Sequence, residues 1–186
     1  MPPFPRRTGA TEQYNNGIMI HVCSLALLNK TIEETGARHV VTLLGAADQV
    51  PLPSQIARGN YLRLFVHDIV DPTPGQNHPD VEHVERLIAF VRAWPRETPM
   101  VIHCWAGISR STAAAFTTVC ALNPKRDEHE IAQAIRAASI TAQPNTRIVR
   151  FADQLLGRNG RMVEAVQALP PCVPALQAEP FRLDLA

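Results

Sequence analysis

The most constraining feature of the sequence is the stretch from Met100 to Ser111, where a short apolar segment runs directly into a small loop. Met100–His103 is typical of a strand that is covered on both faces of a sheet. The loop that follows contains Gly107, which permits backbone dihedrals that other residues avoid. Arg110 and Ser111 then open a helix-forming segment. A strand, a tight loop and a helix N-terminus in this order predict an α/β domain with a binding site at the loop.

The loop between this strand and helix is predicted to bind an anion. Its backbone N–H groups converge above the N-terminus of the helix, where the helix macrodipole favours negative charge. The planar guanidinium of Arg110 can bind two phosphate oxygens at once, which a lysine cannot do. We therefore expect a phosphate cradle made of Trp105, Ala106, Gly107, Ile108, Ser109 and Arg110.

Cys104 lies at the base of this predicted cradle. A thiol at a helix N-terminus ionises readily, so we expect a thiolate aimed at the bound phosphorus. Ser111 can donate a hydrogen bond to the sulfur and so stabilise the thiolate when it leaves.

The pattern His-Cys-x5-Arg-Ser resembles the signature loop of the cysteine-dependent protein tyrosine phosphatases, and the chain's size is similar to that of the dual-specificity branch. The resemblance covers residues 18–156. It implies that Cys104 is the nucleophile, Arg110 the phosphate clamp and Ser111 the thiolate stabiliser. It also implies that His103 holds the cysteine through hydrogen bonds.

The family also uses a general acid, usually an aspartate on a mobile loop that follows a strand 30 to 40 residues upstream. Asp68 stands 36 residues before Cys104 and follows the apolar run of residues 62–66. Its position favours Asp68 over the alternative, Asp71, and the loop of residues 71–77 is a possible lid. Pro144-Asn145 resembles a pair that caps a helix and braces the signature loop in many small phosphatases.

The order of the remaining segments predicts the fold class. Three further apolar runs suit strands, at residues 18–22, 40–44 and 61–66. Ser24 and Gly36 can start and end a first helix, and Pro79-Asp80 and Pro95 bound a second. Later helices are expected over 111–122, 127–138, 145–156 and 161–169. We predict a mostly parallel sheet of four to five strands with helices on both sides and a helical C-terminal half. Residues 17–169 would form one domain, between a loose lead-in (1–16) and a proline-rich tail (170–186).

Composition narrows the function further. The 186 residues carry 18 Lys+Arg against 17 Asp+Glu, so nothing favours bulk nucleic-acid or membrane-surface binding. The four cysteines are too few and too scattered for a disulfide scaffold, which favours a reducing, cytoplasmic setting. Cys23 could form a reversible disulfide with Cys104. His78 and His83 are poorly spaced for one helical face, so we expect no metal site and no cofactor.

These observations predict a phosphomonoester hydrolase, most simply a protein tyrosine or dual-specificity phosphatase acting through a phosphocysteine. Its partner would be a phosphorylated protein or a small phosphomonoester. The alternatives are an inactive phosphatase fold that captures phosphorylated partners, and a rhodanese-type sulfurtransferase. The loop lacks lysine, which argues against phosphoinositides by comparison with lipid-directed relatives. The sequence leaves the physiological substrate and the oligomeric state open.

Overall fold

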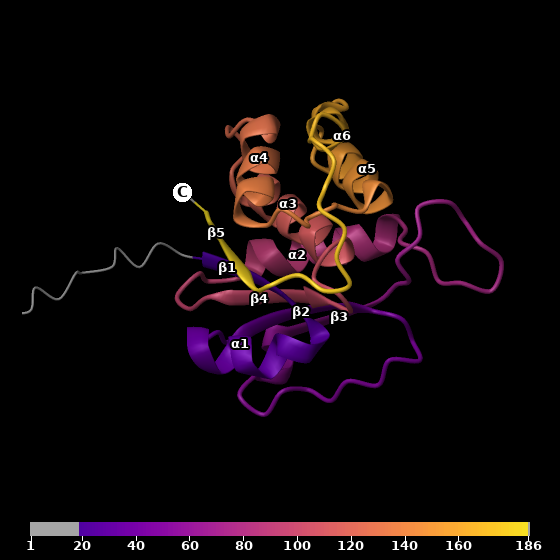
Figure 1. The fold of residues 1–186 in the computed structure, drawn as a ribbon. Helices are drawn as coiled ribbons and strands as arrows, with labels where there is room; N and C mark the ends of the chain where they lie inside the picture. The colour runs from indigo at the N-terminus through magenta and orange to yellow at the C-terminus, as the bar shows by residue number, and fades with distance from the viewer. Residues whose placement is uncertain (1–18, 186) are drawn as a thin grey trace, which may run out of the picture.

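The computed structural model describes residues 19–185, so the lead-in expected over residues 1–16 lies outside the described part. A five-stranded sheet in the order β3-β2-β4-β1-β5 forms the centre of the molecule (Figure 1). Its first four strands are parallel to one another, and β5 runs antiparallel to β1. The strands are β1 (Met19–Ser24), β2 (His39–Leu44), β3 (Tyr61–Phe65), β4 (Met100–Cys104) and β5 (Phe181–Asp184).

Within residues 19–185, six α-helices cover the two faces of the sheet. In Figure 1, α1 lies below the sheet and the other five helices lie above it. This arrangement confirms the predicted fold class, including the helices on both sides and the helical C-terminal half. The helices are α1 (Leu28–Thr35), α2 (Val81–Ala93), α3 (Arg110–Leu122), α4 (Glu128–Ala138), α5 (Thr146–Leu155) and α6 (Arg161–Gln167).

Strand β4 lies in the middle of the sheet, and all five of its side chains are buried. Successive side chains point to opposite faces of the sheet. Ile102 therefore joins the large apolar core between the sheet and α2 to α6, and Val101 joins the smaller core between the sheet and α1. Because both faces are covered, the carboxyl end of β4 is held firmly. The position at which the following loop begins is therefore well defined.

Most of the predicted helix boundaries agree with the structure. Gly36 ends α1 in the left-handed conformation (φ 67°), and Asp80 caps α2 through the N–H of His83. Ser24 is the exception. Its hydroxyl makes no capping hydrogen bond, because a short 3₁₀ turn (Leu25–Leu27) intervenes before α1 begins at Leu28.

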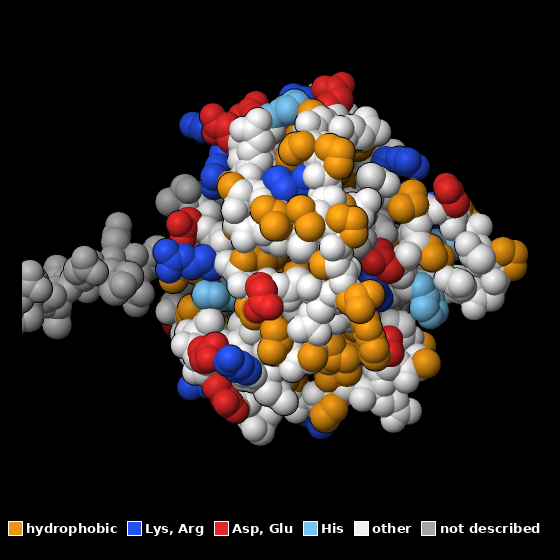
Figure 2. All heavy atoms as spheres, viewed as in Figure 1, with side chains coloured by type: hydrophobic (Ala, Val, Ile, Leu, Met, Phe, Trp, Pro, Cys, Tyr) orange, Lys and Arg blue, Asp and Glu red, His pale blue; other side chains and the backbone are white. Residues whose placement is uncertain are grey.

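Strand β5 lies within the segment expected to be a proline-rich tail, which corrects that expectation. It pairs with β1 in the register Val22↔Phe181 and Ile20↔Leu183, and the side chains of Phe181 and Leu183 are buried in the large core. The last residues therefore complete the sheet edge. Figure 2 shows acidic and basic side chains mixed over the surface of the viewed face. None of the helices among residues 19–185 is long and apolar enough to span a bilayer.

Candidate active site

The signature loop, residues 104–110, leads from the carboxyl end of β4 into the first turn of α3. The structure brings the residues predicted from the motif together and buries the reactive ones. Cys104 is 1% exposed, while Arg110 and Ser111 are also buried. Trp105, the next residue after the cysteine, is 59% exposed. The sulfur therefore lies deep, below a rim that carries an indole ring.

Hydrogen bonds from outside the loop fix the direction of its peptide groups. Because a trans peptide is planar, its C=O and the N–H of the next residue point in opposite directions. A carbonyl held from outside thus turns the next N–H toward the interior of the loop. Four carbonyls are held in this way: Trp105 by the N–H of Leu25 (3.1 Å), Ala106 by Ala178 (2.9 Å), Ile108 by Gln143 (2.9 Å) and Ser109 by Asn145 (3.2 Å). The amides turned inward are those of Ala106, Gly107, Ser109 and Arg110.

Gly107 is required by both its conformation and its surroundings. Its φ of 76° lies in the left-handed region. A Cβ at this position would lie 2.9 Å from the carbonyl carbon of Cys23 and 2.9 Å from the amide nitrogen of Ser24. Any larger residue would push the loop away from the end of β1 and open the cradle.

Cys104, the predicted nucleophile, has a close polar neighbour in Ser111 and follows a buried histidine. Cys104 Sγ lies 3.1 Å from Ser111 Oγ, the geometry needed for the hydroxyl to donate to a thiolate. His103 is fully buried, and its Nε2 lies 2.7 Å from Thr42 Oγ1 on β2. Burial lowers the pKa of His103 to about 4, and the positive charges of Arg63 and Arg110 act in the same direction. The ring is therefore neutral at physiological pH and ties β4 to β2.

Arg110 extends toward the end of β3. Its Nη1 donates to the carbonyl of Val66 (2.9 Å), which fixes the guanidinium beside the loop. Its Nε is buried and has no hydrogen-bond partner among residues 19–185. A buried donor without a partner is costly, so an anion in the cradle would satisfy it.

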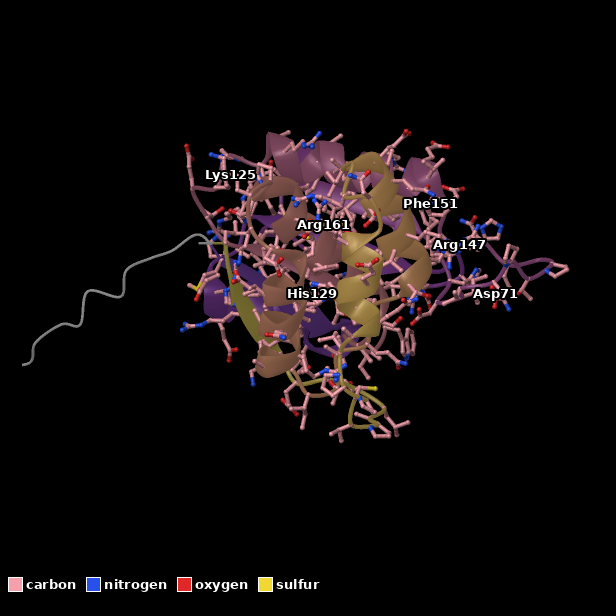
Figure 3. All side chains as sticks on the ribbon, turned by 90° about the horizontal axis from the view of Figure 1, so that it is seen from above. Asp71, Lys125, His129, Arg147, Phe151 and Arg161 are labelled. Atoms are coloured by element: carbon pink, nitrogen blue, oxygen red, sulfur yellow. The ribbon has the colours of Figure 1, made fainter. Side chains whose placement is uncertain are left out.

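Asp68, not Asp71, lies at the mouth of the cradle. Its Oδ1 accepts hydrogen bonds from Ser109 Oγ (2.7 Å) and Asn145 Nδ2 (2.9 Å). Its Oδ2 lies 3.7 Å from Arg110 Nε. Asp71 is exposed on the loop that extends away from the body of the protein (Figure 3). The chain thus places one carboxyl group, with 37% of its side chain exposed, next to Arg110, the predicted phosphate clamp.

Asn145 and Arg147, at the start of α5, hold the loop that carries Asp68. Asn145 Oδ1 caps the helix, as the Pro144-Asn145 pattern predicts, while its Nδ2 contacts Asp68. Arg147 Nε donates to the carbonyl of Pro79 (2.5 Å), and its Nη1 donates to that of Val70 (3.2 Å). Figure 3 shows Arg147 beside Phe151, whose ring lies 5.2 Å from the guanidinium carbon. Sequence reasoning missed Arg147, because nothing near it in the sequence marks it as part of a site.

Cys23 lies on the strand beside the nucleophile but on the other side of the sheet. In the pairing of β1 with β4, Ser24 is opposite Cys104 and Cys23 is opposite His103. Neighbouring residues of a strand point to opposite faces, and Cys23 packs in the core under α1 while Cys104 belongs to the other core. Burial raises the pKa of the Cys23 thiol to about 12.

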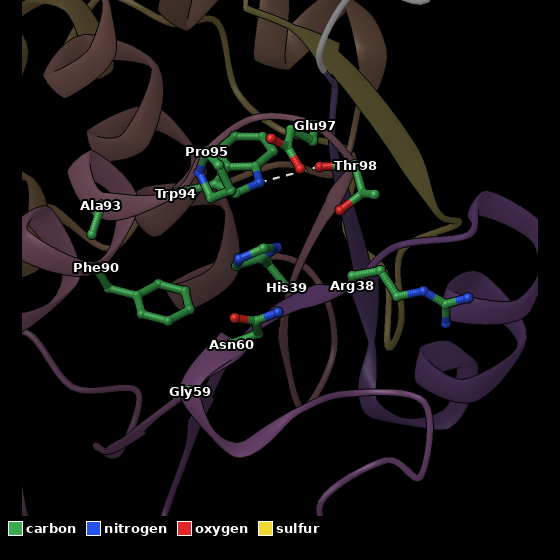
Figure 4. A pocket seen from close by; sticks show the side chains of 10 residues that line it. All are labelled: Arg38, His39, Gly59, Asn60, Phe90, Ala93, Trp94, Pro95, Glu97 and Thr98. Carbon is green, nitrogen blue, oxygen red and sulfur yellow. Dashed lines mark hydrogen bonds between the residues drawn. The ribbon is translucent and has the colours of Figure 1, made fainter.

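A separate hollow of about 350 Å³ lies at the opposite end of the sheet (Figure 4). It surrounds His39, at the start of β2, whose ring lies 6.3 Å from those of both Phe90 and Trp94. The indole N–H of Trp94 donates to the carbonyl of Thr98. Because parallel strands run from this end toward the signature loop, the hollow takes no part in the cradle.

Comparisons with known proteins show which chains share this fold. The family model of the protein-tyrosine phosphatases matches residues 72–145. The solved structure of DUSP15 is similar to this chain, with a TM-score of 0.57 and 19% sequence identity. The similarity covers 81% of this chain and 92% of DUSP15. Human DUSP28 is similar over 80% of this chain and 94% of its own (TM-score 0.55, 19% identity). The structure of PTPMT1 in complex with PI(5)P is similar over 76% of this chain and 95% of PTPMT1 (TM-score 0.56, 13% identity). No curated protein matches the sequence.

The fold is that of a phosphatase-like domain, and the loop that contains Cys104 and Arg110 lies inside the part of the chain that the family model matches. The family model of the protein-tyrosine phosphatases matches part of the chain, and the fold of the chain is similar to that of DUSP15 and DUSP28.

Proposed function

We propose that the protein hydrolyses phosphomonoesters through a phosphocysteine intermediate and without a metal ion. The observation that supports this most strongly is the convergence of three groups on one point: the Cys104 sulfur, the inward amides of its loop, and Asp68 beside Arg110. A thiol below an anion cradle and a carboxyl group at its mouth are the parts that phosphoryl transfer needs.

In the first step the Cys104 thiolate attacks the phosphorus in line, and the bond between phosphorus and the ester oxygen breaks. Asp68 gives its proton to the departing oxygen. Arg110 and the loop amides bind the equatorial phosphate oxygens, where charge accumulates in the transition state.

In the second step water attacks the phosphorus of the phosphocysteine, and the ionised Asp68 takes a proton from it. The sulfur–phosphorus bond breaks, inorganic phosphate leaves, and the thiolate is stabilised by Ser111, 3.1 Å away. The neutral His103 contributes by tying the end of β4 to β2 through Thr42, which keeps the sulfur at the base of the cradle.

The substrate we propose is a phosphorylated protein, dephosphorylated at tyrosine or at both tyrosine and serine/threonine. The burial of the Cys104 sulfur beside the exposed Trp105 supports a substrate whose phosphate stands well away from its peptide backbone, as that of phosphotyrosine does. Comparing kcat/KM for a phosphotyrosine peptide with that for the same peptide carrying phosphoserine tests this assignment. Equal values would support dual specificity, and a preference for phosphoserine would contradict a deep pocket.

Hydrolysis of para-nitrophenyl phosphate between pH 4.5 and 8, without added metal, tests the mechanism. Cys104→Ser should abolish turnover. Asp68→Asn should lower kcat by about 10²-fold or more and remove the alkaline fall in activity, because the acid is absent. Asp71→Asn is the matched control and should retain the wild-type profile. Turnover that survives in Cys104→Ser, or a loss with Asp71→Asn instead of Asp68→Asn, would contradict the proposed roles.

A further inference from the structure

The last part of the chain, residues 170–185, approaches the signature loop from outside the segment that the family model matches. We call residues 170–185 the C-terminal segment. In Figure 1 it is the yellow trace that descends from α6, passes the carboxyl ends of the central strands and turns back into β5. Ala178, three residues before β5, is buried (2% exposed) and donates its N–H to the carbonyl of Ala106 at 2.9 Å.

We propose that the C-terminal segment is a working part of the active site, in which Ala178 is a positioning residue for the phosphate cradle. The inference rests on the proposed function of that cradle. The peptide that joins Ala106 to Gly107 is planar, so holding its carbonyl outside directs the N–H of Gly107 toward the bound phosphate. Ala178 thereby sets the direction of an amide that belongs to another part of the chain.

This peptide has greater need of an external anchor than the other peptides of the loop. Gly107 has no side chain to restrict it, and glycine adopts either sign of φ readily. The peptides that follow Ile108 and Ser109 are held by residues of the 139–145 turn, close to α5. The peptide that follows Trp105 is held from the end of β1 by Leu25. For the Ala106–Gly107 peptide, the anchor comes from the C-terminal segment.

Strand β5 holds Ala178 in place. Phe181 pairs with Val22 and Leu183 with Ile20, and both side chains are buried in the large core. Because Val22 lies two residues before Ser24, and Ser24 is opposite Cys104, β5 is attached to the strand that borders the nucleophile. The packing of β5 against β1 and the order of the phosphate cradle are therefore linked through the short stretch from Ala178 to Phe181.

The test compares substitutions that remove or retain the Ala178 N–H. Ala178→Pro deletes the donor, whereas Ala178→Gly keeps it. Gln177→Pro is the matched control. In the wild type, the Gln177 N–H makes none of the backbone hydrogen bonds found in the loops and turns of residues 19–185. The probe is sodium tungstate, a phosphate mimic, titrated by calorimetry alongside steady-state hydrolysis of para-nitrophenyl phosphate.

We expect Ala178→Pro to weaken tungstate binding about tenfold and to lower kcat/KM by a similar factor, as loss of one oriented donor does. The pH profile should keep its shape, because Asp68 is not touched. Gln177→Pro should behave like the wild type, and Ala178→Gly, which keeps the donor, should bind tungstate much more tightly than Ala178→Pro. Tungstate binding at wild-type strength by a folded Ala178→Pro protein would overturn the proposal.

A second variant covers the case in which Ala178→Pro does not fold. Phe181→Ala loosens β5 without changing the donor, and hydrogen exchange at the Leu183 amide reports how far the strand is released. Tungstate affinity should fall as that exchange accelerates, and an unchanged affinity with β5 released would refute the proposal. Because tungstate binding needs no turnover, a wild-type protein that binds the anion but hydrolyses nothing would refute the proposed function alone.

Discussion

The buried histidine beside Cys104 makes the stability of the protein depend on pH, and the size of this effect can be worked out from its pKa shift. His103 has its pKa lowered from 6.5 to about 4, chiefly by burial. The unfolded chain therefore takes up a proton at a higher pH than the folded protein does. Between pH 6.5 and 4 the free energy of unfolding falls as the pH falls, and above about pH 6.5 this contribution is constant.

The size of this effect follows from the two pKa values. A lowering from 6.5 to about 4 corresponds to about 3 kcal/mol, at 1.36 kcal/mol for each pH unit. Most of it, about 2 kcal/mol, should be lost between pH 7 and pH 4.5. Burial also lowers the pKa values of His21 and His39, so the wild-type protein should lose more than this in total.

Comparing the wild type with His103→Gln isolates the contribution of this one residue. Glutamine does not titrate, and its amide can still reach the hydroxyl of Thr42. Urea denaturation at pH 7 and at pH 4.5 should show the variant losing about 2 kcal/mol less than the wild type between the two conditions. Equal losses would refute the argument that His103 is buried in its neutral form.

Three further predictions test other parts of the structure. Gly107→Ala should weaken tungstate binding at least tenfold and lower the urea midpoint, because the new Cβ would lie 2.9 Å from backbone atoms at a φ of 76°. Arg158→Ala should cost about 3 kcal/mol or more in thermal unfolding, since it removes the 2.7 Å partner of the buried Glu128, while alanine at the half-exposed Arg161 should lower stability much less. Arg147→Ala should lower kcat about tenfold and flatten the alkaline limb of the pH profile with little change in KM, because the acid loop loses its anchor; an effect on KM alone would count against this role.

The part of the site that could be predicted is the part that is continuous in the sequence. Cys104, Arg110 and Ser111 occupy one strand–loop–helix unit, so their spacing already determines which side chains face the same point. The helix ends at Gly36 and Asp80 could be predicted for the same reason, because a cap is a local interaction. Ser24 shows the limit of such reasoning, since a serine before a helix suits a cap whether or not a 3₁₀ turn intervenes.

The contacts that could not be predicted join segments distant in sequence. Asn145 reaches Asp68 across 77 positions, and Arg147 reaches Pro79 across 68. Strand β5 has four residues and follows a proline-rich stretch, so its alternation of buried and exposed side chains is too short to mark a strand. The position of β5 is determined by β1, because β5 pairs with the edge of that strand.

The backbone anchors of the signature loop explain why a short motif is not enough to make the site. Leu25, Gln143, Asn145 and Ala178 hold the loop through main-chain N–H groups. All residues but proline carry that donor, so the four positions tolerate many side chains and leave no recognisable pattern. What they require is a fold that brings three separate segments to one loop. The motif supplies the reacting groups, and the direction of each amide in the cradle depends on how the rest of the chain packs around it.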